Sequence, residues 1–298
     1  MSEYVLPGVP RPGKETLAVR DRSLFDWVYP TLICPVCGAG LFRDGESVRC
    51  PARHTFDLSA KGTLNLSPAA GKKHGDDAEM IASRRRFLSL GYYAPLSDAL
   101  SDEVALRLPD GGIVLDAGCG EGYYTAAVAN RLPSLRLVAL DLSPEAVREC
   151  AKRIEARSGR IFPLVAGVYR LPLSNRSIDG VISAFSPYAG EEFARVLKPG
   201  GFLFRAIPDC RHLFALKEVL YDEPYENEVA DFETDGFEFL GAKEVKTSFT
   251  LKTPSEIADL FRMTPYAYRT PPRGKERLAA RSELAVGAEF LLLTYRKA

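Results

Sequence analysis

The stretch VLDAGCGEG, residues 114–122, decides how the rest of this chain is interpreted. It joins an apolar run that begins at Ile113 to the amphipathic stretch GYYTAAVANRL, the pattern of a buried strand followed by a helix. Gly118, Gly120 and Gly122 permit a tight turn and a close approach of the backbone to a ligand. Several classes of nucleotide-binding enzyme use such a turn, so the glycines alone indicate only a nucleotide-like ligand.

Two carboxylates beside this turn narrow the choice of ligand. Asp116 lies two residues ahead of Gly118, where its charge would repel a pyrophosphate and would favour a cation. The spacing is also G-x-G-x-G, not the G-x-G-x-x-G of dinucleotide-binding proteins. We therefore expect Asp116 and Gly118 to bind S-adenosylmethionine, whose sulfonium and ammonium are cationic. Asp141 ends the next apolar run, where it can accept hydrogen bonds from a ribose diol; the alternative is a helix-capping role.

Apolar and amphipathic segments alternate from Ile113 onward. The apolar runs IVLDAG, RLVALD, IFPLVAG, DGVISAF and GFLFRAI are separated by amphipathic segments and short connections. This alternation predicts an α/β fold with a parallel, doubly wound sheet. The sequence KPGG, residues 198–201, resembles the helix end that class I methyltransferases have before their fifth strand. Two later runs, KEVKTSFTL and EFLLLTYR, are predicted strands separated by an insertion from about Pro254 to Ser282.

A second motif lies near the N-terminus. The sequences CPVCG and CPARH contain Cys34 and Cys37, then Cys50 and His54, with twelve residues between the two pairs. This spacing is typical of a tetrahedral zinc site with four protein ligands and no open position. Zinc binding can fold a segment too short to bury much core, so we expect a small zinc-binding domain here. The alternative is that the four residues lie close together by chance.

The composition is typical of a globular protein of about two domains, with 298 residues, 46% of them hydrophobic and 26% charged. No apolar run reaches the length of a membrane span, and the N-terminus lacks the apolar core of a signal peptide. Three of the six cysteines belong to the zinc motif, which leaves an odd number elsewhere. An odd remainder argues against a disulfide framework, so we expect a reducing, cytoplasmic location and no membrane partner.

Basic residues are concentrated in two stretches, although the formal net charge is zero. Residues 49–86 contain eight Lys or Arg against four acids, and residues 262–281 contain six against one. Local basic charge indicates an anionic partner such as RNA. The alternative, which is common for charged runs, is that these are solvated faces.

Taken in order, the motifs resemble those of one family. The chain contains the zinc motif, then HTFDLSAKGTLNL, DDAEMIASRRRFLSLGYYAPL, VLDAGCGEGYYT, EEFARVLKPGG, RHLFALK and MTPYAY. Over about residues 31–298 this order resembles the 23S rRNA (guanine-N(1))-methyltransferases, which include the tylosin-resistance methyltransferases. The resemblance implies a class I (Rossmann-like) methyltransferase that transfers a methyl group from S-adenosylmethionine to ring nitrogen 1 of a guanine in a 23S rRNA hairpin.

The resemblance also implies which residues bind the cofactor and the metal. It implies cofactor contacts at Tyr93, Gly120, Glu121 and His212, and it implies structural zinc on the four N-terminal ligands. It implies a homodimer as well. The expected domains are an N-terminal extension, a zinc-finger RNA-recognition domain, a linker with helices, and a methyltransferase domain. Their ranges are 1–30, 31–66, 67–110 and 111–298.

The residues leave parts of the chemistry open. The sequence assigns no proton acceptor, although Glu191 and Asp209 are considered. Phe185 and Tyr188 could stack on an unpaired base or simply pack at a strand end. The chain departs from the family pattern at Tyr169 and at Ser186-Pro187-Tyr188, and the second of these departures lies at the expected base pocket.

Other functions remain open from the sequence. One is a methyltransferase that acts on a different RNA, a protein or a small molecule. Another is a zinc-dependent RNA-binding protein with a vestigial methyltransferase domain, and a third is a nicotinamide dehydrogenase.

Overall fold

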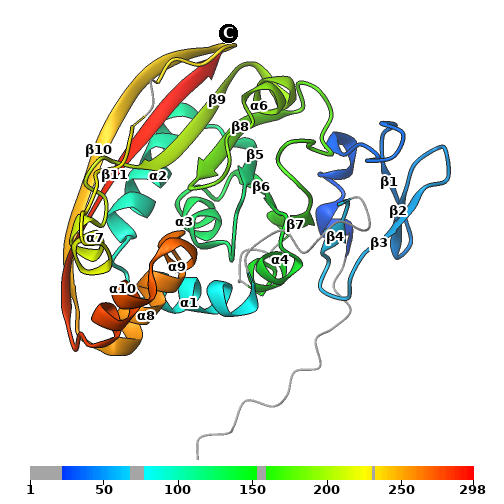
Figure 1. The fold of residues 1–298 in the computed structure, drawn as a ribbon. Coiled ribbons are helices and arrows are strands. Elements are labelled where there is room, and N and C mark those ends of the chain that lie inside the picture. The colour runs from blue at the N-terminus through cyan, green and yellow to red at the C-terminus, as the bar shows by residue number, and fades with distance from the viewer. Residues whose placement is uncertain (1–21, 68–76, 153–158, 230–231) are drawn as a thin grey trace, which may run out of the picture.

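An eight-stranded sheet forms the centre of the protein (Figure 1). The computed structural model describes residues 22–67, 77–152, 159–229 and 232–298. The strand order is β10-β11-β9-β8-β5-β6-β7-β4. The strands of this sheet are β4 (Leu64–Asn65), β5 (Gly112–Ala117), β6 (Leu135–Asp141), β7 (Ile161–Val165), β8 (Ile178–Ala184), β9 (Leu197–Pro208), β10 (Phe237–Leu251) and β11 (Leu284–Lys297).

The sheet is parallel except at one edge. Every neighbouring pair from β4 to β9 is parallel, whereas β9–β11 and β11–β10 are antiparallel. All five residues of β7 and most residues of β6 and β8 are buried, as expected for parallel strands covered on both faces. The mostly parallel, doubly wound sheet predicted from the alternating pattern is confirmed.

Helices connect the strands and cover the sheet. They are α1 (Ala78–Ser89), α2 (Ala94–Arg107), α3 (Tyr123–Arg131), α4 (Pro144–Cys150), α6 (Gly190–Val196), α7 (Phe214–Leu220), α8 (Pro254–Arg262), α9 (Tyr266–Arg269) and α10 (Pro272–Ala279). None of these helices is long and apolar enough to cross a membrane.

Two apolar cores lie on opposite faces of the sheet. Val114 of β5 packs in one core with Leu100 of α2 and Val128 of α3. The next residue, Leu115, packs in the other core with Phe193 of α6 and with side chains from residues 25–66. Successive side chains of a strand point to opposite faces, so both cores follow from the same continuous apolar run. The N-terminal segment therefore covers part of a sheet face that helices cover elsewhere.

The zinc motif lies in a small three-stranded sheet at one end of the molecule (Figure 1). Its strands are β1 (Phe42–Asp44), β2 (Ser47–Arg49) and β3 (Thr55–Asp57), preceded by two short 3₁₀ segments, η1 (Arg22–Phe25) and η2 (Tyr29–Thr31). Phe25 and Tyr29 pack edge-on against Phe162 of β7, with ring centroids 5.3 and 6.1 Å apart. Because β4 also pairs with β7, the motif is attached to the central sheet by both backbone and side chains.

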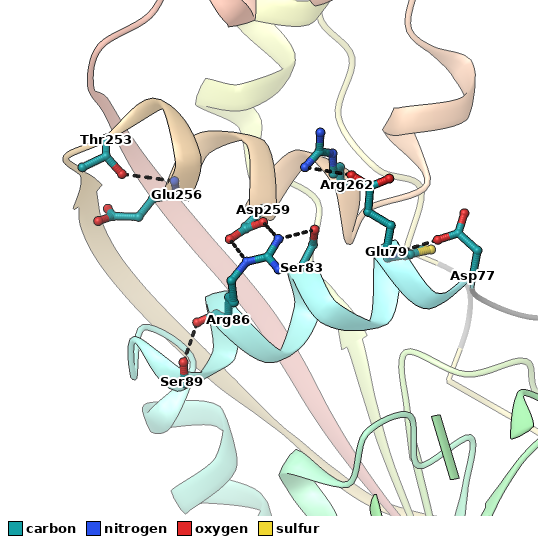
Figure 2. A network of polar contacts seen from close by, with 10 residues as sticks. Asp77, Glu79, Ser83, Arg86, Ser89, Thr253, Glu256, Asp259 and Arg262 are labelled. Carbon is teal, nitrogen blue, oxygen red and sulfur yellow. Dashed lines mark hydrogen bonds and ion pairs between the residues drawn. The ribbon is translucent and has the colours of Figure 1, made fainter. Parts of the chain in front are cut away.

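The predicted insertion after β10 folds into α8, α9 and α10, and α8 packs on α1 (Figure 2). Each of the two packed helices begins at a capping side chain: Asp77 accepts a hydrogen bond from Met80 N, and Thr253 accepts one from Glu256 N. Arg86 of α1 binds Asp259 of α8 through two hydrogen bonds. This contact fixes the insertion beside the carboxyl edge of the parallel strands.

Candidate functional site

The glycine-rich turn lies at the carboxyl end of β5. Gly118 has a φ of +91° and Gly120 a φ of +55°, values that residues with a Cβ atom rarely adopt. A Cβ on Gly118 would also lie only 2.4 Å from Cβ of Ser186, in the loop after β8. Gly118 N and Cys119 N both donate to Leu140 O, at 2.8 and 2.9 Å. These contacts join the turn to the end of β6 and keep it tight.

Asp141 ends β6 and organises both turns beside it. Its Oδ2 accepts a hydrogen bond from Gly120 N at 2.9 Å, and its Oδ1 accepts one from Ser143 N at 2.8 Å. Ser143 in turn caps α4 by accepting from Ala146 N. The helix-start role left open by the sequence is therefore present. Asp141 also accepts a hydrogen bond from the glycine turn, and it lies at the strand end where a ribose contact is expected.

Asp116 is buried beneath the same turn, with 1% of its surface exposed. Its pKa is raised to about 7, chiefly by burial and also by the charges of Asp141 and Glu121. The Thr125 hydroxyl, which donates to Asp116 Oδ2 at 2.5 Å, opposes this rise in pKa. Removing a carboxylate from water disfavours its charged form, so this group titrates near neutral pH. A cationic ligand on the turn would favour the ionised state.

Aromatic rings form a wall beside the turn, and they come from five separate parts of the chain. The ring of His212, which follows β9, lies 4.7 Å from Phe290 of β11 and 6.4 Å from Phe185 at the end of β8. Tyr93, which precedes α2, lies 4.9 Å from Phe290, and Tyr124 of α3 lies 6.2 Å from Phe185. The parallel strands end at one edge, which brings these residues together.

His212 is held as a neutral imidazole. Burial lowers its pKa to about 4, although its hydrogen bond to the backbone of Glu289 opposes that shift. Because a carbonyl oxygen can only accept, Nδ1 carries the proton and donates to Glu289 O at 2.9 Å. The Nε2 atom is then an acceptor on the side of the ring away from this bond.

The structure thus gathers the predicted cofactor residues at one edge of the sheet. Asp116, Gly118, Gly120, Glu121 and Asp141 surround the turn, while Tyr93 and His212 belong to the aromatic wall. The sequence did not single out Tyr124 or Phe290. An aromatic directly after a glycine turn was a usable signal for Tyr124, but Phe290 resembles any core residue of a strand.

Neither acid considered as proton acceptor is favoured by its surroundings. Glu191 is exposed in the first turn of α6, and Asp209 Oδ1 accepts from Cys210 N at 2.7 Å. The proton acceptor stays unassigned.

The four predicted zinc ligands converge. Their ligand atoms all lie within 4.8 Å of one another. Cys37 Sγ is 3.7 Å from Cys50 Sγ, and His54 Nδ1 is 3.5 Å from Cys34 Sγ and 3.3 Å from Cys50 Sγ. A tetrahedral zinc ion with ordinary bond lengths requires separations of about 3.8 Å between sulfurs and about 3.5 Å between sulfur and nitrogen. The donor set and its spacing therefore fit structural zinc.

Part of the predicted basic charge is used within the protein. Ion pairs join Arg49 to Asp44, Arg85 to Glu149, Arg86 to Asp259, Arg262 to Glu79 and Arg277 to Asp222. By contrast, Arg53, Arg273, Lys275 and Arg281 are exposed without an ion-pair partner among the described residues. Lys72 and Lys73 lie outside those residues. Fewer basic side chains are therefore available to an anionic partner than the number of Lys and Arg residues in the two stretches suggests.

The turn and its wall also fit S-adenosylmethionine. Tyr93 is buried and Tyr124 is half-buried, and both hydroxyl oxygens are buried without a hydrogen-bond partner in the part of the chain that the structure describes. Buried hydroxyls usually have partners, so these two are suited to polar groups of a ligand. Asp116 and Asp141 are placed where they would face its cationic and ribose ends, and the glycines would leave room for it at the backbone.

Comparison with known proteins gives the same assignment. Residues 114–201 match the family model described as "Methyltransferase domain", and residues 32–74 match the one described as "RlmA, N-terminal". A candidate 23S rRNA (guanine-N(1)-)-methyltransferase of Micromonospora griseorubida is 37% identical over 90% of this chain and 97% of its own length. The 23S rRNA (guanine(748)-N(1))-methyltransferase of Streptomyces fradiae is 32% identical over 74% of this chain and 80% of its own.

A further relative comes from Bacillus subtilis. Its protein YxjB, also a candidate 23S rRNA (guanine-N(1)-)-methyltransferase, is 31% identical over 84% of this chain and 90% of its own length. The zinc cluster, the parallel sheet with its glycine turn and these full-length similarities agree. The chain belongs to the 23S rRNA (guanine-N(1))-methyltransferase family.

Proposed function

We propose that this protein transfers a methyl group from S-adenosylmethionine to ring nitrogen 1 of a guanine in a hairpin of 23S rRNA. One observation carries the proposal: a cation-adapted glycine turn and a zinc-ligand cluster occur in one chain that matches such enzymes over most of its length. A cofactor pocket alone would fit many methyl acceptors. The zinc module and the full-length similarity favour RNA.

The cofactor supplies an electrophilic methyl group, so the chain must bring the acceptor nitrogen into line with it. Ring nitrogen 1 lies on the Watson–Crick edge of guanine and is hidden in a base pair. The base must therefore be unpaired or flipped out, which costs a few kcal/mol. An aromatic surface at the pocket mouth would recover part of that cost by stacking.

We assign this stacking role to Phe185. The residue is 43% exposed, and its φ of +56° is strained for a residue with a Cβ atom. That backbone conformation places the residue between the glycine turn and the aromatic wall, where it is 6.2 Å from Tyr124 and 6.4 Å from His212.

Tyr188 is less suited to stack on a base. Its hydroxyl bonds the Thr234 hydroxyl, its ring packs edge-on against Phe193, and the guanidinium of Arg205 lies 4.2 Å above the ring. Those contacts account for this side chain without a nucleic acid.

The zinc module would dock the RNA and the methyltransferase domain would select the base. Zinc knuckles recognise unpaired nucleotides better than regular duplex, because the major groove of A-form RNA is too narrow to read. Exposed Arg53 of the module, together with Arg273, Lys275 and Arg281 near α10, would contact phosphates. With ribosomal RNA as substrate, the enzyme would act in the cytoplasm. A homodimer that grips one hairpin is part of the same proposal.

Methylation at ring nitrogen 1 can be mapped by reverse transcription, since the added methyl blocks base pairing. The purified chain is incubated with unmodified 23S rRNA and S-adenosylmethionine, and the product is copied by reverse transcriptase. The proposal predicts a strong stop next to one guanine, which is absent when S-adenosylmethionine is omitted. Label in the RNA without a stop at a guanine would contradict the assigned position.

A further inference from the structure

Three consecutive arginines of α1 point toward three different parts of the protein. Arg85 binds Glu149 of α4 at 2.8 Å, and Arg86 binds Asp259 of α8 (Figure 2). Both side chains are mainly exposed, whereas Arg84 is half-buried. Residues three and four positions apart share one face of an α-helix, so Arg84 lies on the face of the buried Ile81 and Leu88. The anchoring of α1 on both sides fixes the orientation of this face.

Arg84 reaches the glycine turn. Its terminal nitrogen lies 3.6 Å from the position that a Cβ atom would occupy on Gly120. Its charge also acts on the buried Tyr124 hydroxyl, where it opposes the rise in pKa that burial causes. The guanidinium therefore lies between the turn and the first residues of α3, in the region where S-adenosylmethionine would bind.

This region is otherwise acidic. The carboxylates of Glu121 and Asp141 lie close enough to that of Asp116 to raise its pKa. Such a set favours the sulfonium and the ammonium of S-adenosylmethionine but repels the carboxylate of its methionine part. A carboxylate enters an acidic site only beside a cation that neutralises it. A guanidinium offers two parallel donors that match the geometry of a carboxylate.

We propose that Arg84 binds the carboxylate of the methionine part of S-adenosylmethionine. Each charged part of the amino-acid end of the ligand would then face a group of opposite charge. Asp116 would face its cationic groups, and Arg84 would face its carboxylate. The inference rests on the cofactor of the proposed function but not on the RNA substrate. Its test therefore uses binding alone.

The test compares two probes that differ in the carboxylate only. S-adenosylhomocysteine carries it, and its decarboxylated analogue S-adenosyl-3-thiopropylamine does not. Calorimetry on the full chain should show that Arg84→Gln lowers the affinity for S-adenosylhomocysteine roughly 10- to 100-fold, the usual effect of losing a hydrogen-bonded charge. Affinity for the decarboxylated probe should stay the same or rise. Arg84→Lys should recover part of the loss, since it restores the charge without the planar pair of donors.

Arg85→Gln is the matched control, because it removes the neighbouring arginine of the same helix and should alter neither affinity. If Arg84→Gln lowered the affinity for both probes equally, Arg84 would have a structural role and the inference would be overturned. Unchanged affinity for S-adenosylhomocysteine, combined with weaker binding of 23S rRNA, would overturn it in favour of a phosphate contact. Either outcome leaves the proposed methylation of RNA open to its own test.

Discussion

Arg86 and Asp259 form a two-pronged ion pair across the α1–α8 contact, with Nε to Oδ2 at 2.8 Å and a terminal nitrogen to Oδ1 at 2.5 Å (Figure 2). The Asp259 side chain is 7% exposed, whereas that of Arg86 is 53% exposed. The same terminal nitrogen also donates to Ser83 Oγ at 3.1 Å. This ion pair therefore joins α8, in the insertion after β10, to α1, the helix that precedes the methyltransferase domain.

Loss of this pair should destabilise the protein. Arg86→Gln leaves the buried Asp259 carboxylate without its charge partner, which we expect to cost about 3 kcal/mol in the free energy of unfolding. The double variant Arg86→Gln/Asp259→Asn should be less destabilised than the two single changes predict by addition. Urea unfolding of the four proteins measures this coupling. Strict additivity would show that the two side chains do not act as a pair.

The zinc module should depend on its metal, while the cofactor pocket should not. Cys37→Ser removes one of four ligands, so we expect loss of bound zinc and local unfolding of residues 31–57. Metal analysis and limited proteolysis measure both effects. The three-stranded sheet that carries the ligands lies at the opposite end of the molecule from the β10–β11 pair, and β7 and β6 lie between β4 and β5, whose end bears the glycine turn (Figure 1). Affinity for S-adenosylhomocysteine should stay close to that of the unmodified protein, and a large fall would contradict this separation.

Cofactor binding should strengthen as the pH rises through neutrality. The pKa of Asp116 is about 7 without ligand, and a cationic ligand favours the charged carboxylate. Affinity for S-adenosylmethionine should therefore increase between about pH 6 and pH 7.5, with proton release on binding. Asp116→Asn should bind more weakly and with a flatter pH dependence. Calorimetry in two buffers of different ionisation enthalpy counts the protons, and no release near pH 7 would contradict the assignment.

The free protein should show the opposite trend in stability. A folded-state pKa near 7 lies above the unfolded value of about 3.9, so the folded state holds the proton of Asp116 more tightly. The stability that this tighter proton binding contributes is fully present below about pH 4 and is lost as the pH rises through 7. Asp116→Asn should remove that part of the pH dependence in thermal unfolding.

Phe185 should affect RNA methylation more strongly than cofactor binding. Replacing a ring that stacks on a base by alanine costs about 1–3 kcal/mol, so Phe185→Ala should lower kcat/KM for RNA roughly 10- to 100-fold. Phe185→Tyr keeps the ring and should retain most activity. Tyr188→Phe removes only the hydroxyl that bonds Thr234 and serves as the control. Equal losses for Phe185→Ala and Tyr188→Phe would contradict the distinction between the two aromatics.

Local sequence predicted the parts of this molecule that depend on short-range patterns. Continuous apolar runs gave the parallel strands, and ligand spacing gave the cluster of Cys34, Cys37, Cys50 and His54. The position of the glycine turn followed from the strand before it. Each of these features is encoded within a few dozen residues, where periodicity and spacing are visible.

Features that depend on distant parts of the chain could not be predicted in this way. A two-residue strand such as β4 carries no periodicity, so its parallel pairing with β7 has no sequence signal. Asp259, the acid that pairs with Arg86, lies 173 residues further along the chain. The sequence alone therefore overstated the number of basic side chains that are free to bind an anionic partner. The aromatic wall likewise joins Tyr93 to Phe290 through tertiary packing alone.

The most direct test of the central claim is incorporation of tritium from labelled S-adenosylmethionine into 23S rRNA by the purified, zinc-loaded protein. Our account predicts label in 23S rRNA, recovered on digestion as 1-methylguanine from one position. It also predicts that a synthetic hairpin in which this guanine is replaced by adenine stays unlabelled. Unlabelled 23S rRNA, together with label in a protein, a small molecule or another RNA, would contradict the account.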